Sequence, residues 1–248
     1  MTSRQKNDGH DITLPDGWPD NSFSAYMLNF FQNQLACFEL KRGPFLRIER
    51  IDKIFFNLLG DWQNPKGLIE ALLCYRTHSA FRTASVVTMA GALTESFALQ
   101  RVCLEQAGYA IRMGGDNSLA EAWLRRDEDK FYARIVRAEF THAKIKNAIA
   151  VKDIHTSNVY SDLYERCISW GAHPNEKSLT IGGAIEKEEG LRRYGQIYLH
   201  GDGEAMNMAL KTLMQVAVCS LDILSLVFPD RVKQANLVLA IKSVRARL

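Results

Sequence analysis

The chain has 248 residues, of which 47% are hydrophobic and 24% are charged, and its formal net charge is +3. These values are ordinary for a globular protein and argue against disorder over most of the chain. The length is enough for one sizeable hydrophobic core, and a charge of +3 does not by itself indicate a nucleic-acid partner. Five cysteines are scattered through apolar patterns without a CxxC pair: Cys37, Cys74, Cys103, Cys167 and Cys219. We therefore expect a cytoplasmic protein with reduced, buried thiols, and neither a disulfide framework nor a zinc site.

The first 21 residues are polar and rich in Asp, Asn and Gly, and they include Pro15 and Pro19. They contain no apolar run of the kind found in secretory signals. Neither a repeat nor a linker divides the rest of the chain. We predict an irregular N-terminal arm over residues 1–21 and a single helical domain over residues 22–248.

Apolar residues recur every three or four positions over residues 23–38, which predicts an amphipathic helix that ends at Gly43. A second helix is predicted to begin near Pro44, because proline suits the first helical turn. The periodic stretch over residues 65–113 is too long for one ordinary helix, and we expect a break near His78–Ser79. The part after this break is apolar nearly all round, which is typical of a central, buried helix.

Shorter helical patterns follow the glycine pair at 114–115, over residues 119–126, 128–140, 144–150 and 153–170. A long apolar helix over residues 203–228 and a final helix from Pro229 complete the series. The apolar run from Leu213 to Phe228 contains Gln215 and Asp222. It falls short of the roughly 20 apolar residues that a membrane span needs, so we predict a buried core helix and no membrane partner.

Residues 179–199 change from helical periodicity to a pattern with glycines on both sides of a charged turn, which predicts a two-stranded hairpin. The predicted fold is mainly α, an irregular bundle of about eight helices with one small β-hairpin at about residues 179–199. Helices with two apolar faces also favour a homodimer, because isologous pairing is the commonest way to cover such a face.

The first candidate site is Arg166 with His173, seven residues later, near the end of a predicted helix. Seven residues make two helical turns, so both side chains can share one face. An arginine can stabilise charge on phosphate oxygens, and a histidine can move a proton at neutral pH, so the pair suits phosphodiester cleavage without a metal. Gly171 lies between them and can end the helix before His173, which would separate the two side chains.

An Arg followed after four to six residues by a His, late in an all-α chain, resembles the motif of the HEPN superfamily. The resemblance covers eight residues and the general architecture. It implies a helical dimer and a metal-independent endoribonuclease in which Arg166 and His173 are the catalytic pair, completed across the dimer interface. The alternative interpretation is structural, with Arg166 paired to a carboxylate of the core and His173 capping the helix.

The second candidate is a polar seam on the helix predicted to be central. Its members step by seven, four, three and four residues, which places them on one helix face: Thr94, Arg101, Glu105, Gly108 and Arg112. Charges on a buried helix need partners, so we expect Arg101, Glu105 and Arg112 to pair across to Arg166 or Glu165, or to line a polar pocket. The alternative is an ion pair that only fixes helix register.

The stretch from Phe81 to Arg126, with Arg101, Glu105 and the Trp-Leu-Arg-Arg sequence at 123–126, is similar to a group of bacterial helical proteins of unknown function. The resemblance extends to Tyr164 and to the His-Pro-Asn sequence at 173–175, which adds Asn175 to the candidate pocket. This resemblance implies no activity.

The remaining sequence signals are weak. His200 and Asp202 lie two residues apart and are interpreted as a turn and a helix cap, since two ligands do not make a metal site. A phosphate-binding loop, a serine nucleophile elbow and a zinc-protease motif are all missing from the sequence. We therefore expect no metal and no cofactor.

Two classes of function remain. The first is a non-enzymatic interaction module that binds a protein or a small ligand through a helical groove. The second is the HEPN-like endoribonuclease with RNA as its partner. The motif at Arg166 and His173 is short, so the sequence favours the interaction module.

Overall fold

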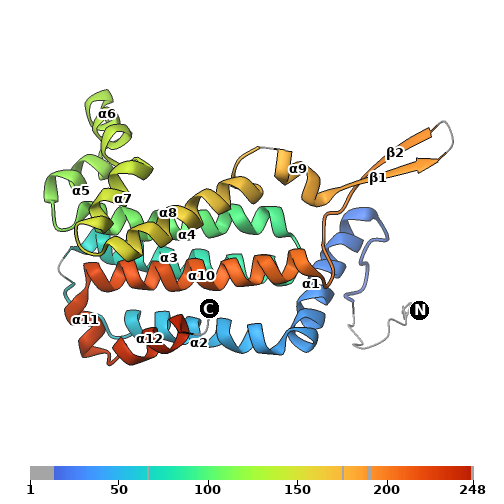
Figure 1. The fold of residues 1–248 in the computed structure, drawn as a ribbon, viewed down its shortest axis with the longest axis horizontal. Coiled ribbons are helices and arrows are strands. Elements are labelled where there is room, and N and C mark those ends of the chain that lie inside the picture. Colours follow the sequence, from blue (N-terminus) through green and yellow to red (C-terminus); the bar gives the residue numbers. More distant parts are fainter. Residues whose placement is uncertain (1–13, 66, 175, 189–190, 247–248) are drawn as a thin grey trace.

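The computed structural model describes residues 14–65, 67–174, 176–188 and 191–246. Within these residues it contains twelve α-helices, one π-helical segment and one β-hairpin, arranged as an irregular bundle (Figure 1). The prediction of a mainly α fold is confirmed. The expected number of about eight helices is too low; the predicted final helix is divided into two, and a short helix precedes the hairpin.

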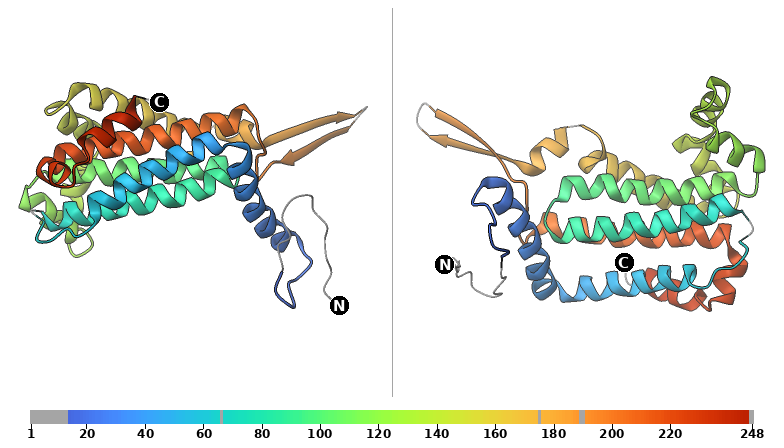
Figure 2. Two further views of the ribbon diagram at one scale, coloured as in Figure 1. Left: turned by 90° about the horizontal axis from the view of Figure 1, so that it is seen from below. Right: turned by 180° about the vertical axis from the view of Figure 1, so that it is seen from behind.

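Three long helices form the centre of the bundle: α3 (Leu68–Met89), α4 (Leu93–Met113) and α10 (Glu204–Val227). They run side by side in all three ribbon views (Figures 1 and 2). α10 is buried along most of its length, as the apolar pattern predicts. In the part of the chain that the structure describes, α10 is the one helix long and apolar enough to cross a membrane, and 67% of its apolar window is buried inside the fold.

The break in the long periodic stretch does not lie at His78–Ser79, where the sequence analysis placed it. α3 continues through His78, which stacks on Phe55 with ring centroids 5.2 Å apart and lies with Nε2 2.6 Å from Oδ1 of Asp52. Because its polar ring has partners in the packed bundle, His78 does not interrupt the helix. The chain instead turns at Gly91, whose φ of +89° lies in the left-handed region that favours glycine.

The other helices surround this centre (Figure 2). They are α1 (Ser22–Leu40), α2 (Arg42–Leu59), α5 (Asn117–Leu124), α6 (Lys130–Glu139), α7 (His142–Ala150), α8 (Ile154–Cys167), α11 (Pro229–Gln234) and α12 (Val238–Arg245). Several begin at a side chain that accepts hydrogen bonds from their first free amides: Asn21, Asp116, Asp129, Thr141 and Asp153. The predicted final helix is divided into α11 and α12 at Asn236, whose φ is +54°.

The predicted hairpin is present, but it is shorter than expected. β1 (Gly183–Glu188) pairs antiparallel with β2 (Leu191–Gln196), and Gly183 lies opposite Gln196. Leu179 and Ile181, which the sequence analysis placed in the first strand, belong to α9 (Glu176–Gly182). Of the predicted N-terminal arm, residues 1–13 lie outside the described residues, and residues 14–20 form no helix or strand.

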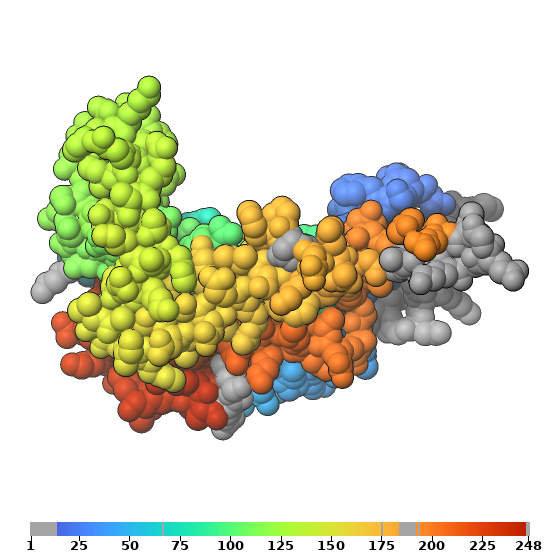
Figure 3. Space-filling model, turned by 45° about the horizontal axis from the view of Figure 1, so that its top comes forward, coloured from blue at the N-terminus to red at the C-terminus, as the bar shows by residue number. Residues whose placement is uncertain are grey.

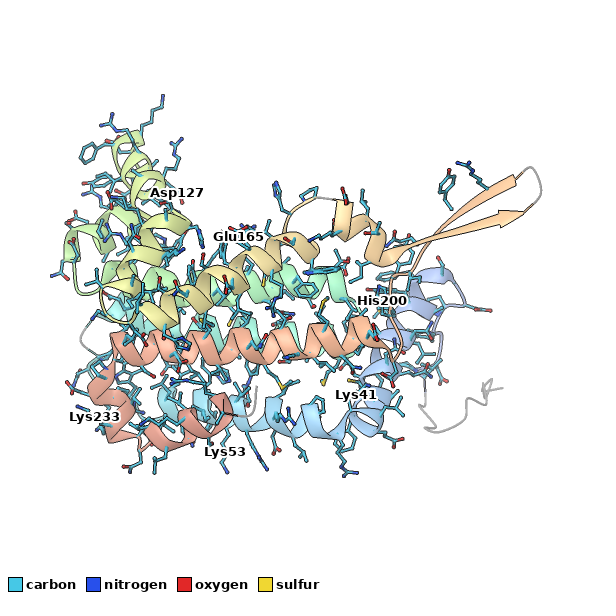
Figure 4. All side chains as sticks on the ribbon, in the orientation of Figure 1. Lys41, Lys53, Asp127, Glu165, His200 and Lys233 are labelled. Atoms are coloured by element: carbon cyan, nitrogen blue, oxygen red, sulfur yellow. The ribbon has the colours of Figure 1, made fainter. Side chains whose placement is uncertain are left out.

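The end of the bundle near the hairpin depends on a close backbone contact at Gly91. The amide of His200 donates a 2.9 Å hydrogen bond to the carbonyl of Gly91, and a Cβ on Gly91 would collide with the backbone of His200. Figure 4 labels His200 at this junction. The contact therefore ties the chain segment before α10 to the turn between α3 and α4.

We expect Gly91→Ala to lower the free energy of unfolding by at least about 3 kcal/mol, because it adds this collision to the roughly 1–2 kcal/mol strain of a left-handed alanine. Gly115→Ala is the matched control, since Gly115 also has a positive φ, +86°, but its Cβ would meet open space. Urea unfolding of the two variants measures the difference. Equal losses would show that the contact with His200 does not matter.

Candidate functional site

Arg166 lies near the C-terminal end of α8, on the side that faces α10. Its Nη1 donates to Oε1 of Gln215 at 2.8 Å and to the hydroxyl of Thr212 at 3.4 Å. The side chain is half-buried, and it forms no ion pair with any carboxylate of the described residues. The expected pairing of Arg166 with a core carboxylate is thus replaced by hydrogen bonds to two neutral side chains.

Beside Arg166 there is a cavity of about 280 Å³ between α8, α10 and α12. Apolar and polar groups both line it, as is usual for small-molecule sites. The lining residues are His155, Thr156, Val159, Asp162, Leu163, Arg166, Gln215, Val218, Cys219, Asp222 and Arg245.

The spacing of these residues explains why they meet. On α8, Val159, Asp162 and Arg166 follow one another by three and four residues, so they share one helix face. On α10, Gln215 and Asp222 are seven residues apart and therefore also share a face. The cavity forms where these two faces meet.

The second arginine of the cavity is neutralised. Arg245 of α12 donates to Oδ1 of Asp222 across 23 residues of sequence. Burial raises the pKa of Asp222 above its ordinary value, although the guanidinium opposes this shift. Asp162 is exposed at the edge of the cavity and makes no ion pair with Arg166. Arg166 is therefore the cation of the cavity that has no counter-charge within the described part of the chain.

The cavity also contains a thiol. Cys219 is buried, and burial raises the pKa of its thiol well above the ordinary value. Because the thiolate is the nucleophilic form, Cys219 is a poor nucleophile at neutral pH. His155 is exposed on the first turn of α8. We conclude that the arrangement is better suited to holding a ligand than to attacking one.

His173 does not lie on the helix face of Arg166, as the two-turn spacing predicted. After Cys167 the α-helix becomes a π-helical segment, η1 (Ile168–Ala172), and His173 is extended, with φ −150° and ψ 142°. The reason is Gly171, where a Cβ would collide with the backbone of Thr94 in α4. The exposed His173 is absent from the residues that line the cavity beside Arg166.

The polar seam of α4 makes two separate sets of contacts, one with α8 and η1 and the other with α6. Nε of Arg101 donates to Oε1 of Glu105 at 2.8 Å, and its Nη1 donates to the carbonyl of Ala172 at 3.1 Å. The hydroxyl of Tyr164 donates to the same Glu105 oxygen at 3.0 Å, and burial raises the pKa of Tyr164 to about 12. This cluster fixes α4 against α8 and η1, and it involves neither Arg166 nor Glu165.

The far end of the seam contacts another helix. Arg112 forms an ion pair with Glu139 at the end of α6, and its Nε also donates to the Glu139 carbonyl at 3.2 Å. Asn175, the last predicted member of the pocket, lies outside the described residues. Arg101 and Arg112 therefore serve separate contacts, and the seam does not form one pocket.

Most residues of the cavity were not predicted from the sequence. Gln215 and Asp222 interrupt an apolar run, and their spacing of seven residues is a usable signal for a polar face on a buried helix. No pattern in the sequence places Arg245 at the cavity, because its position depends on how α12 folds back against α10.

Comparison with known proteins gives no relative from which to assign a role, since no protein-family model, curated protein or solved structure matches this chain. Among the residues that the structure describes, no group of three or more His, Cys, Asp or Glu side chains is placed to hold a metal ion.

Proposed function

We propose that this chain is a non-enzymatic binding module that holds a small organic anion in the cavity between α8, α10 and α12. The observation that carries the proposal is Arg166, a half-buried cation that lines a cavity of about 280 Å³ and has only neutral hydrogen-bond partners in the described structure. A charge that is partly removed from water without a counter-ion loses part of its hydration, and a bound anion would offset that loss.

The geometry of Arg166 also supports an anionic ligand. A guanidinium has five N–H donors in a planar fork that matches carboxylate and phosphate groups. Thr212 and Gln215 both accept from Nη1, which leaves the other donors of the fork for a ligand. Val159, Leu163 and Val218 supply apolar walls, so an anion with an apolar body fits better than a simple inorganic ion.

We expect Arg166→Gln to weaken binding of the best anionic probe by about 10- to 100-fold, which corresponds to one charged hydrogen-bonding group at roughly 1.5–3 kcal/mol. The probes are acetate, succinate and phenyl phosphate, and their dissociation constants are measured by calorimetry with the full chain. The strongest binding is expected for phenyl phosphate, because it combines the anion with an apolar ring.

Arg76→Gln is the matched control, since it removes the same charge from an exposed position of α3 away from the cavity. Equal affinities of the Arg166→Gln and Arg76→Gln proteins would contradict the proposal. So would failure of all three probes to bind at millimolar concentration.

The HEPN-like endoribonuclease is the second candidate function. It is favoured by the same unpaired Arg166 and by the exposure of His173 seven residues later. Against it, the π-helical segment separates the two side chains along the chain.

We expect purified protein to leave single-stranded RNA intact, with or without EDTA. An Arg166→Ala/His173→Ala double variant, shown to be folded by its circular dichroism, is assayed in parallel by gel electrophoresis. Cleavage that persists in EDTA and disappears in the double variant would establish the ribonuclease and contradict the binding module.

A second copy of this chain is the partner that we propose for one end of the bundle. α1 carries no charged residue from Ser22 to Phe38, and it exposes Phe23, Met27 and Phe31 at intervals of four residues along one face. The hairpin lies at the same end of the molecule and is followed by exposed Tyr198 (Figure 1). An aromatic face without charged residues, as on α1, is typical of the centre of a protein interface.

The exposed area is adequate for a dimer. The exposed fractions of Phe23, Phe31, Tyr194 and Tyr198 are 69%, 49%, 74% and 69%. At about 200 Å² for a whole aromatic side chain, these four supply roughly 500 Å². Met27 and Ile197 bring the surface closer to the roughly 800 Å² per partner of a standard interface. An isolated two-stranded hairpin is marginally stable in water, so a second copy would also support β1 and β2.

We expect the protein to be a dimer by light scattering at micromolar concentration, and Phe23→Asp/Phe31→Asp to make it a monomer, because two buried carboxylates would lack partners. Leu124→Asp is the control, since Leu124 is 57% exposed at the opposite end of the bundle. A wild-type monomer at 100 micromolar, or a double variant that stays dimeric, would contradict this interface.

A further inference from the structure

α6 projects from the bundle. None of its residues is buried, and the segment that contains α5, α6 and α7 rises above the rest of the molecule in the space-filling view (Figure 3). It is attached at its C-terminal end, where Phe140 is buried and Glu139 pairs with Arg112. Ile135 and Val136 pack against the core on one side of α6, and the opposite, exposed side is available for a partner.

One face of α6 is cationic. Lys130, Arg134 and Arg137 lie four and three residues apart, so they share a face, and successive charges are about 6 and 4.5 Å apart along the helix axis. Among the described residues, none of the three forms an ion pair, and Arg137 donates only to the carbonyl of Ala133 in its own helix. Together with Phe131 they line an open hollow of about 510 Å³.

The carboxylates near this face are already engaged. Asp129 accepts the amide of Phe131 as the helix cap, and Asp127 lies 3.6 Å from Arg126. Glu139, at the other end of α6, is held by Arg112 and lies 3.7 Å from Lys144. Glu128 is likewise paired with Arg125, so none of these carboxylates forms an ion pair with Lys130, Arg134 or Arg137.

We propose that the face of α6 formed by Lys130, Phe131, Arg134 and Arg137 binds single-stranded nucleic acid. The three cations lie in a row, and successive phosphates of one strand would meet them in turn. The Phe131 side chain is 53% exposed among them and offers a ring on which a base can stack. A basic row with an aromatic side chain is the combination that binds unpaired strands with little sequence preference.

Two other polyanions fit this face less well. An anionic membrane surface attracts a helix that inserts a broad apolar face, and α6 presents one exposed aromatic ring beside its cations. An acidic peptide would use the charges, but it has no flat ring that requires Phe131. The phosphate row and the stacking ring together therefore favour nucleic acid.

The test measures binding of a fluorescent 12-nucleotide oligouridylate to the full chain by anisotropy, in 50 and 200 mM salt. We expect Lys130→Gln/Arg134→Gln/Arg137→Gln to lose at least tenfold in affinity at 50 mM salt. We also expect it to reduce the slope of log affinity against log salt by about two, at about 0.7 per phosphate contact. Phe131→Ala should lose about tenfold without changing the slope, because stacking involves no counter-ion.

The matched control is Lys53→Gln/Lys233→Gln/Lys242→Gln, which removes the same charge from three exposed lysines. Lys53 and Lys233 lie on the opposite side of the bundle from Asp127, the labelled residue next to α6 (Figure 4). An equal loss of affinity in both triple variants would overturn the proposal, because it would show a general charge effect. No binding of the oligonucleotide by the wild type at 50 mM salt would also overturn it.

Two further probes decide between classes of partner. Vesicles of phosphatidylserine with phosphatidylcholine test the membrane, and a polyglutamate peptide tests an acidic protein. Stronger binding to either than to the oligonucleotide, lost in the α6 triple variant, would overturn the nucleic-acid assignment. The α6 triple variant should bind phenyl phosphate as tightly as the wild type, because none of its three residues lines the cavity, so the outcome for α6 is independent of the outcome for the cavity.

Discussion

The burial of α10 is the constraint on which the rest of the structure depends. A helix that is apolar on nearly all sides must be covered on nearly all sides, and α3, α4, α2, α8 and α12 provide this cover. Its few polar side chains then need partners inside the fold, because an unsatisfied buried polar group is costly. Arg166 from α8 satisfies Thr212 and Gln215, and Arg245 from α12 satisfies Asp222. The cavity lies where these polar pairs keep the neighbouring helices from closing completely on α10.

The contacts of Arg101 and Arg166 distinguish an arginine with a structural role from one that is free to bind a ligand. Arg101 has a structural role, because Glu105, Tyr164 and the carbonyl of Ala172 surround it and join three elements. Arg166 has two neutral acceptors beside a cavity. A hydrophobic residue at 166 would fill part of that cavity, and replacing a buried charge by a well-packed apolar side chain is often neutral or stabilising. Thr212 and Gln215 use only Nη1 of this arginine, whereas an anionic ligand would use the remaining donors of the guanidinium.

Elements that depend on local periodicity could be predicted from the sequence, whereas features that depend on contacts between distant parts of the chain could not. The apolar pattern of residues 203–228 was enough to predict a buried helix, and the glycines around 190 were enough to predict a hairpin. The break placed at His78 was wrong because the partners of this histidine, Asp52 and Phe55, lie more than 20 residues earlier. The shared face of Arg166 and His173 failed for a similar reason, since Gly171 ends the helical geometry by packing on Thr94 in another helix. The partners of Arg166 lie 46 and 49 residues away, beyond the reach of any local pattern.

The two proposed binding surfaces lie at opposite ends of the molecule and differ in charge (Figure 1). α1 presents exposed aromatic side chains in a segment without charged residues at one end, and α6 presents unpaired cations at the other (Figure 1). A dimer formed through α1 and the hairpin would leave both copies of α6 at its outer ends. The two cationic faces could then bind two segments of one strand, and the second contact would be intramolecular and so favoured by a high effective concentration. The gain would vanish for strands too short to reach both ends, so the monomeric α1 variant and the dimer should bind a short oligonucleotide equally and a long one differently.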